Sequence, residues 1–166
     1  MSIIRKTLLA ALLFQAALSA TPALAEITGA APDFSLPGMD NTTVNLSDYK
    51  GKVVYVDFWA SWCSPCKDSF PWMSAMQRKY ADKGVEFIAI NVDRKSADAE
   101  KFLKETPADF TIAFDHKGKT PKAYEVMGMP TAFLIGKDGK VLHSHIGFSE
   151  TDKLNYERNI QMAIKR

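Results

Sequence analysis

Cysteine and histidine are scarce in this chain, and their scarcity excludes several kinds of site. The 166 residues include two cysteines and three histidines, and both cysteines fall in one tetrapeptide, Cys63-Ser64-Pro65-Cys66. A structural zinc site takes four ligands, and no second cysteine pair supplies the other two, so we expect no metal. A disulfide across so short a loop removes little entropy from the unfolded chain. The pair is therefore better explained by chemistry than by structural cross-linking.

Beyond the first residues, the chain also has no excess of basic or of acidic residues. The chain has 21 Lys and Arg against 19 Asp and Glu, and two of the basic residues, Arg5 and Lys6, lie in an N-terminal segment without acidic residues. The remainder is formally neutral. A neutral domain has no electrostatic attraction to nucleic acid or to an anionic membrane, so we expect no nucleic-acid partner.

Long apolar runs are absent except near the N-terminus. The two basic residues precede a mostly apolar stretch at residues 7–20, and an Ala-Leu-Ala tripeptide ending at Ala25 follows it. Such a stretch is shorter than the ~20 residues that span a membrane, and this order of segments is typical of a secretory signal. We predict cleavage after Ala25, export to the periplasm and one domain over residues 26–166. An uncleaved N-terminal membrane anchor is the alternative.

The remaining chain alternates strand-like and helix-like segments. Nearly continuous β-branched and aromatic runs, typical of buried strands, lie at residues 52–59 and 85–92. Short hairpins are expected at residues 33–46 and around Asp138-Gly139, a dipeptide that favours primed turns. Helices are expected to follow the cysteine pair to about residue 83, and at residues 96–106, 121–127 and 149–166. This order predicts an α/β sandwich with a mixed sheet.

Several helix ends carry recognisable signals. Ser96 and Ser149 are expected to cap the helices that follow them, and Gly128 is expected to end the third helix in a left-handed conformation. Leu154 is expected on the apolar face of the last helix. His143 and His145 are two residues apart on a predicted strand and share a face, where we expect them to be solvated.

The cysteine pair lies where a helix follows the first buried strand. A helix N-terminus has unpaired N–H groups and a positive dipole end, which stabilise a thiolate. We expect Cys63 to attack a client disulfide and Cys66, one turn later, to resolve the mixed disulfide. Pro65 restricts the loop between them. The redox-active disulfide itself is the only redox group that this chemistry needs, so no other cofactor is expected.

The surrounding residues resemble the thioredoxin active-site segment. Residues 56–67 read Val-Asp-Phe-Trp-Ala-Ser-Trp-Cys-Ser-Pro-Cys-Lys, and Gly128-Met129-Pro130-Thr131 is similar to the loop before the cis proline of that superfamily. The hairpin at residues 33–46 and the extra strand and helix between residues 93 and 121 resemble the exported TlpA/ResA/CcmG-like branch. The resemblance implies a thioredoxin-like three-layer sandwich, with a central mixed sheet flanked by helices, an N-terminal hairpin and an inserted strand–helix.

The resemblance also implies roles for individual residues. Asp57, in a buried strand, is expected to have a raised pKa and to accept the proton of Cys66; the alternative is a strand-end carboxylate that reaches solvent. Pro130 is expected to be cis and to place Met129 beside Cys63, against an extended client segment. Other expected client contacts are Trp62, Ser64, Pro65 and Thr131. Trp59 is expected in the core.

Two positions depart from the family patterns. Ala89 stands where thioredoxins commonly carry a lysine that faces the buried acid, so Asp57 lacks that cation. The further acidic residue that cytochrome-maturation members often carry near the groove has no evident counterpart.

The leading functional hypothesis is a periplasmic reductant of client disulfides, with apocytochrome c cysteines among the candidate clients. A reductant there needs a membrane-embedded electron donor of the DsbD/CcdA type. Ser64-Pro65 lacks the histidine found between the cysteines of strongly oxidising members. The alternatives are a disulfide-donating oxidase or isomerase, a thiol peroxidase, and a metal- or apocytochrome-holding module. Ala60 stands where peroxiredoxins carry Thr or Ser, which disfavours the peroxidase.

Overall fold

The computed structural model describes residues 29–166. The predicted signal segment, its cleavage point after Ala25 and the start of the predicted domain lie outside the described residues. Within them, no helix has both the length and the apolar character needed to cross a membrane.

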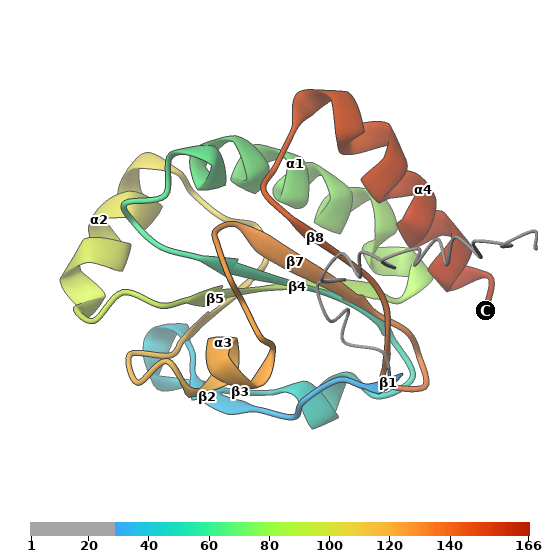
Figure 1. The fold of residues 1–166 in the computed structure, drawn as a ribbon, viewed down its shortest axis with the longest axis horizontal. Coiled ribbons are helices and arrows are strands. Elements are labelled where there is room, and N and C mark those ends of the chain that lie inside the picture. The colour runs from blue at the N-terminus through green and yellow to red at the C-terminus, as the bar shows by residue number, and fades with distance from the viewer. Residues whose placement is uncertain (1–28) are drawn as a thin grey trace, which may run out of the picture.

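A mixed sheet of six strands, in the order β1-β8-β7-β4-β5-β6, forms the middle of the molecule (Figure 1). β4, β5 and β6 run parallel, and β7 is antiparallel to both of its neighbours, β4 and β8. The central strand β4 is buried along its whole length, as its continuous apolar run predicts. The strands span Gly29–Ala30 (β1), Val53–Trp59 (β4), Val85–Asn91 (β5), Thr111–Phe114 (β6), Thr131–Ile135 (β7) and Lys140–Ile146 (β8).

Helices and a hairpin cover the two faces of this sheet. Helices α1 (Ser64–Tyr80), α2 (Ser96–Glu105) and α4 (Lys153–Ile164) lie on one face. The opposite face is covered by α3 (Lys119–Ala123) and by the antiparallel hairpin of β2 (Ser35–Pro37) and β3 (Thr43–Asn45) (Figure 1). The predicted three-layer sandwich, with its N-terminal hairpin and its inserted β6 strand, is confirmed.

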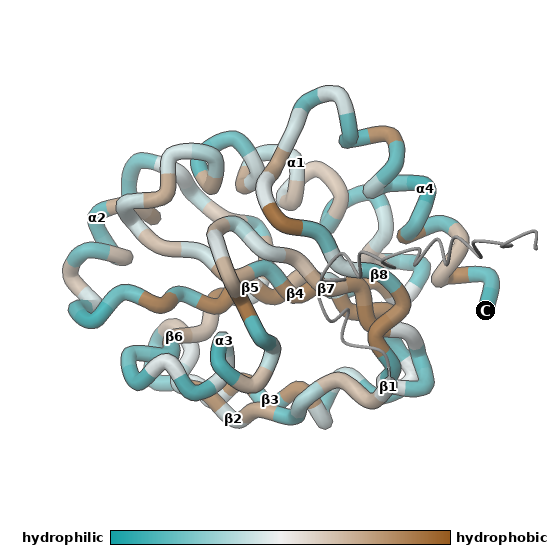
Figure 2. The backbone as a smooth tube through the Cα atoms, in the orientation of Figure 1, coloured by the Kyte–Doolittle hydropathy of each residue, from teal (hydrophilic) through white to brown (hydrophobic). Residues whose placement is uncertain are grey.

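Each face has its own apolar core. Trp59, Phe70 and Phe102 belong to the core under α1, α2 and α4, whereas Phe58 and Tyr124 belong to the core under the hairpin and α3. Burying one such side chain contributes about 1.5–3 kcal/mol. Figure 2 shows the hydrophobic residues concentrated along β4, β5 and β7, between the two covering layers.

The predicted end of α3 was wrong. The helix ends at Ala123, and the left-handed residue is Glu125 (φ 51°), not Gly128. The backbone N–H of Val126 donates to the carbonyl of Pro121 at 2.9 Å, and that of Glu125 to Lys122 at 3.2 Å. This pair of bonds is a Schellman motif, which ends the helix at Ala123, five residues before Gly128.

Three other local predictions were also wrong, and one was confirmed. Ser96 makes no cap; its hydroxyl lies 3.3 Å from Nε2 of His116. Leu154 is 80% exposed, on the outer side of α4. The β7–β8 turn is not primed, because Gly139 has a positive φ and Asp138 does not. Ser149 does cap the last helical segment, since its Oγ accepts a hydrogen bond from the N–H of Thr151.

Candidate active site

The cysteine pair lies at the start of α1, directly after the central strand. Cys63 and Cys66 form a disulfide, and Cys63 is the N-cap residue, with extended backbone angles (φ −85°, ψ 102°). Its N–H donates to the carbonyl of Ala60 at 3.1 Å. Pro65 falls in the first turn, where a helix needs no N–H donor. The strand end, the loop and the proline together fix where the disulfide is presented.

The two cysteines differ in accessibility. Cys63 keeps 4% of its surface exposed and Cys66 keeps none. Trp62 is 72% exposed beside them, Ser64 is exposed and Pro65 is half-buried. A partner can therefore approach Cys63 across the Trp62–Pro65 loop, whereas Cys66 is reached only through Cys63. This asymmetry fits an attacking and a resolving cysteine.

The second loop of the site precedes β7. The Met129–Pro130 peptide bond is cis, and Met129 is half-buried and packs against the same core as both cysteines. The hydroxyl of Thr131 donates to the carbonyl of Gly128 at 2.6 Å, and the side chain is buried. Thr131 is thus placed to hold the loop, with its hydroxyl already occupied. Exposed Met127 precedes this loop.

Asp57 lies on the face of β4 that α1 covers. It is 2% exposed, so the solvent-reaching alternative is wrong. Its neighbours across the sheet are Ala89 on β5 and Ala132 on β7, neither of which offers a polar side chain. Among the described residues, none makes a hydrogen bond to Oδ2 of Asp57. Burial accordingly raises the pKa of Asp57 well above its ordinary value.

The Redoxin family model matches residues 27–160. The chain belongs to the Redoxin family.

Individual relatives agree with this assignment. The Thiol-disulfide oxidoreductase ResA of Bacillus thuringiensis subsp. konkukian is 38% identical over 129 residues, which cover 78% of this chain and 75% of that one. A crystal structure assigned as thiol:disulfide interchange protein DsbE from Chlorobium tepidum is 55% identical, with a TM-score of 0.80 and coverage of 82% and 96%. A thioredoxin family thiol:disulfide interchange protein from Chlorobium tepidum TLS is 26% identical, with a TM-score of 0.73 and coverage of 82% and 97%. The expected thioredoxin-like family and fold are confirmed.

In this Redoxin chain, one acidic residue near the cysteines escaped the sequence analysis. The buried carboxylate of Asp93 accepts hydrogen bonds from the N–H of Ser61 at 2.8 Å and from the amide of Asn91 at 2.8 Å. Ser61 lies two residues before Cys63, so Asp93 holds the loop that carries Cys63. The Asn-x-Asp sequence at the end of a predicted strand was the available signal.

His145 was also misjudged as a solvated strand residue. Its Nε2 lies 2.8 Å from the hydroxyl of Tyr55, and its Nδ1 lies 2.9 Å from the carbonyl of Gly147. The ring stacks on Tyr156 with a centroid separation of 4.0 Å. Burial lowers the pKa of His145. His145 therefore packs against Tyr55 and Tyr156, two members of the core on this face of the Redoxin domain, and is not a solvated strand residue.

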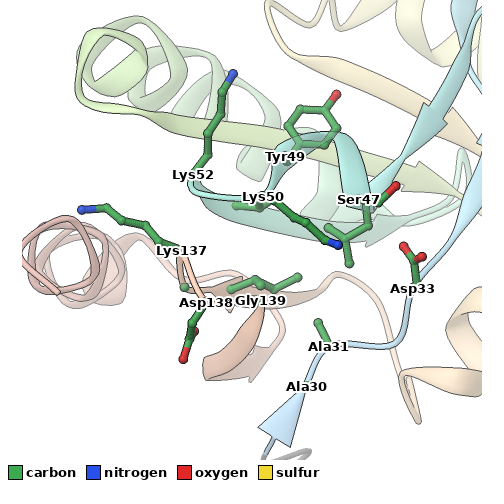
Figure 3. Close-up of a pocket in the computed structure, with 14 residues that line it drawn as sticks. Ala30, Ala31, Asp33, Ser47, Tyr49, Lys50, Lys52, Lys137, Asp138 and Gly139 are labelled. Atoms are coloured by element: carbon green, nitrogen blue, oxygen red, sulfur yellow. The ribbon is translucent and has the colours of Figure 1, made fainter.

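Metal-binding clusters and cavities are the other features that could mark a site. Over residues 29–166, no group of three or more His, Cys, Asp or Glu side chains is arranged to hold a metal. A cavity of about 260 Å³ lies between η2 (Leu46–Tyr49) and the β7–β8 turn, and its lining includes neither cysteine. Figure 3 shows Lys52 and Lys137 pointing away from this cavity; Lys52 pairs with Glu86 instead. This cavity is therefore separate from the disulfide.

Proposed function

We propose that this chain is an exported thiol–disulfide oxidoreductase that reduces disulfides in client proteins. The observation that carries the proposal is the Cys63–Cys66 disulfide at the start of α1, in which Cys63 keeps 4% of its surface exposed and Cys66 keeps none. The names of the relatives, a thiol-disulfide oxidoreductase and a thiol:disulfide interchange protein, support the same class of reaction.

The reaction starts from the dithiol form. The Cys63 thiolate, stabilised by the helix N-terminus, attacks one sulfur of the client disulfide. A mixed disulfide forms and one client thiolate leaves. Cys66 then loses its proton, and its thiolate attacks the Cys63 sulfur. The Cys63–Cys66 disulfide forms, the second client sulfur leaves as a thiolate, and the client has gained two electrons.

Asp57 is the proposed acceptor of the Cys66 proton. It lies under α1, on the face of β4 that also contributes Tyr55 and Trp59 to the core holding both cysteines. A carboxyl with a raised pKa is a stronger base once ionised, and general-base catalysis is most effective when this pKa lies near the working pH.

The client is proposed to bind as an extended segment across the two loops. Trp62, Ser64 and Pro65 offer the surface on the cysteine side, and Met129 offers it beside the cis proline, with Thr131 supporting the loop from below. Exported proteins are the proposed clients, with apocytochrome c cysteines among them. The resemblance to the TlpA/ResA/CcmG-like branch supports this choice.

Export and the electron source are further parts of the proposal. The N-terminal pattern supports a signal peptide cleaved after Ala25 and a periplasmic location, and a membrane-embedded DsbD/CcdA-type protein is the proposed donor. N-terminal sequencing of the protein from a periplasmic fraction tests the cleavage point. Recovery with the membranes and an intact N-terminus would instead establish an anchor.

Reduction of a disulfide-bonded peptide by the pre-reduced protein tests the activity. We expect Cys63→Ser to abolish reduction and Cys66→Ser to accumulate the mixed disulfide, which mass spectrometry detects. The reduction potential tests the direction: a value near about −270 mV supports a reductant, whereas a value near about −120 mV would establish an oxidase. Consumption of hydrogen peroxide by Cys66→Ser would favour a thiol peroxidase.

A further inference from the structure

A row of side chains crosses the sheet beside Asp57. Ala132 on β7 pairs with Asp57 on β4 and with His145 on β8. Directly paired residues project from the same face of a sheet, so these three side chains all lie under α1. The middle one is a methyl group, which leaves room above it for a longer side chain from a neighbouring position.

Tyr55 occupies this room. It lies two residues before Asp57, on the same face of β4, and its hydroxyl lies 2.8 Å from Nε2 of His145. Since β7 separates β4 from β8, the phenol must reach across β7 to make this bond. Its hydroxyl therefore lies beside the His145 ring, and its side chain starts on the same face of the strand as Asp57, two residues away. Burial raises the pKa of Tyr55, and the charges of Asp57 and Tyr156 raise it further.

The hydrogen bonds of His145 determine which group donates in the bond between Tyr55 and His145. Nδ1 faces the carbonyl of Gly147 at 2.9 Å, and a carbonyl only accepts, so Nδ1 carries the ring proton. Nε2 is then the acceptor, and Tyr55 donates to it. This arrangement leaves a lone pair of the Tyr55 oxygen free to receive a proton from Asp57.

We propose that Tyr55 and His145 carry the proton between buried Asp57 and solvent. The proposal rests on the function proposed above, in which Asp57 exchanges a proton with Cys66. A proton moves from the Asp57 carboxyl through one bridging water to the Tyr55 oxygen, while the Tyr55 proton moves to Nε2 of His145. Asp57 becomes a carboxylate, Tyr55 stays neutral, and the resulting imidazolium releases one proton to water. No electron moves in this step.

The surroundings constrain such a transfer. Burial raises the pKa of Asp57 and lowers that of His145, so both shifts oppose movement of the proton toward the imidazole, and loss of the imidazolium proton to water completes the step. The titratable groups that face this pair are Tyr55 from β4 and Tyr156 and Asp152 from the C-terminal helical segment. His145 is half-buried and so has contact with solvent, whereas the neighbours of Asp57 across the sheet, Ala89 and Ala132, carry no titratable group.

Tyr55→Phe tests the path in a single turnover of the reduced protein with a disulfide-bonded peptide. A protonated Asp57 must lose its proton before it can accept that of Cys66. Below the pKa of Asp57 we therefore expect Tyr55→Phe to slow release of the reduced peptide about tenfold, a modest part of the 10²–10⁴-fold typical of acid–base catalysis. The defect should shrink as the pH rises above that pKa. Resolution at the wild-type rate at every pH would overturn the proposal.

Two control measurements separate a proton path from a structural role. In a Cys66→Ser background, Tyr55→Phe should form the mixed disulfide at the same rate as Cys66→Ser alone. Tyr124→Phe removes a buried hydroxyl on the other face of the sheet and should leave every rate unchanged. A slowed first attack, or a defect that is independent of pH, would assign Tyr55 a structural role and overturn the path.

His145→Gln provides the second variant, because its side-chain oxygen can still accept a hydrogen bond but cannot carry a proton onward. We expect the same pH-dependent slowing, with His143→Gln as the matched control on the same strand. Imidazole in the buffer should restore the rate of His145→Ala; full activity of His145→Gln would overturn the path. The exchange reaction is established separately if wild type turns over and Cys63→Ser does not. If wild type does not turn over, the proposed function is refuted. If wild type turns over and the Tyr55 and His145 variants match its rate, only the path is refuted.

Discussion

The two faces of β4 are equally buried but chemically different. Residues that point toward the hairpin and α3 are Val54, Val56 and Phe58, all apolar. The alternate residues, which point toward α1, include Tyr55, Asp57 and Trp59, and each carries a polar atom. The strand thus contributes only apolar side chains to one core and side chains with polar atoms to the other.

This difference shows where the fold gives up stability. Oδ2 of Asp57 and Nε1 of Trp59 are buried without hydrogen-bond partners among residues 29–166. A buried polar group without a partner costs about 1–3 kcal/mol in mutational data. Both lie on β4, on the face that also holds the cysteines; on the opposite face the hydroxyl of Tyr124 on the chain after α3 is also buried and unpaired, but β4 supplies only apolar side chains there. The polar atoms that β4 itself buries are therefore all on the side of the cysteines.

The largest effect on stability should come from the apolar face. Phe58→Ala removes a fully buried ring that contacts Tyr124 and Phe133 and should lower the free energy of unfolding by about 3–5 kcal/mol. Denaturant unfolding measures this loss. The reduction potential of Cys63–Cys66 should stay at the wild-type value, because Phe58 points away from the disulfide. A shifted potential would contradict the division between the two faces.

The face under α1 should respond in the opposite way. Asp57→Asn should slow resolution of the mixed disulfide about 10²-fold near neutral pH, because it removes the proposed base, while the protein stays as stable as wild type or becomes more stable. Stopped-flow release of a reduced client peptide measures the rate. Val56→Ala, the adjacent residue on the other face, is the matched control and should lower stability without slowing resolution. Equal rates for Asp57→Asn and wild type would remove Asp57 from the mechanism.

The sequence predicted much of this comparison but not its polar details. The continuous apolar run at residues 52–59 required a strand buried on both faces, and alternation then placed Asp57 inside the protein. The positions of the cysteines followed from the junction of that strand with a helix. These features depend on residues that are close together in the sequence, so the hydrophobic periodicity is enough to predict them.

The Tyr55–His145 bond could not be predicted in the same way. It joins residues 90 positions apart and depends on β7 lying between their strands with a small residue, Ala132, at the crossing. Periodicity assigns a face to each side chain but not the neighbour that it reaches. The end of α3 was missed for a related reason: Glu125 adopts the left-handed conformation where burial of Tyr124 turns the chain, although a glycine follows three residues later.

The pH dependence of stability gives a smaller and more specific effect. The pKa of Asp57 in the folded protein is raised well above its ordinary value of 3.8. Between these two values the folded state holds a proton that the unfolded chain has released, so stability falls as the pH rises through this window. The slope should approach about 1.4 kcal/mol per pH unit.

Chemical denaturation of the oxidised protein at a series of pH values measures this slope. Asp57→Asn cannot ionise, so subtracting its profile from that of wild type isolates the contribution of Asp57 from those of the other carboxyl groups. The difference should be constant below pH about 4, the ordinary range of a carboxyl, and should grow in favour of Asp57→Asn above it. A difference that does not change with pH would show that Asp57 ionises in the folded protein as readily as in the unfolded chain.

The smallest effects should come from two hydroxyls on opposite faces. Tyr55 donates to His145, whereas the buried hydroxyl of Tyr124 has no partner among the described residues. Tyr55→Phe loses a hydrogen bond and leaves Nε2 of His145 unpaired, so it should cost about 1–3 kcal/mol. Tyr124→Phe removes an unpaired polar atom and should be neutral or stabilising by up to about 1 kcal/mol. Parallel denaturant titrations of both variants measure the two changes. If Tyr124→Phe destabilised the protein as much as Tyr55→Phe, the face under the hairpin would also contain a polar network, and the contrast between the faces would fail.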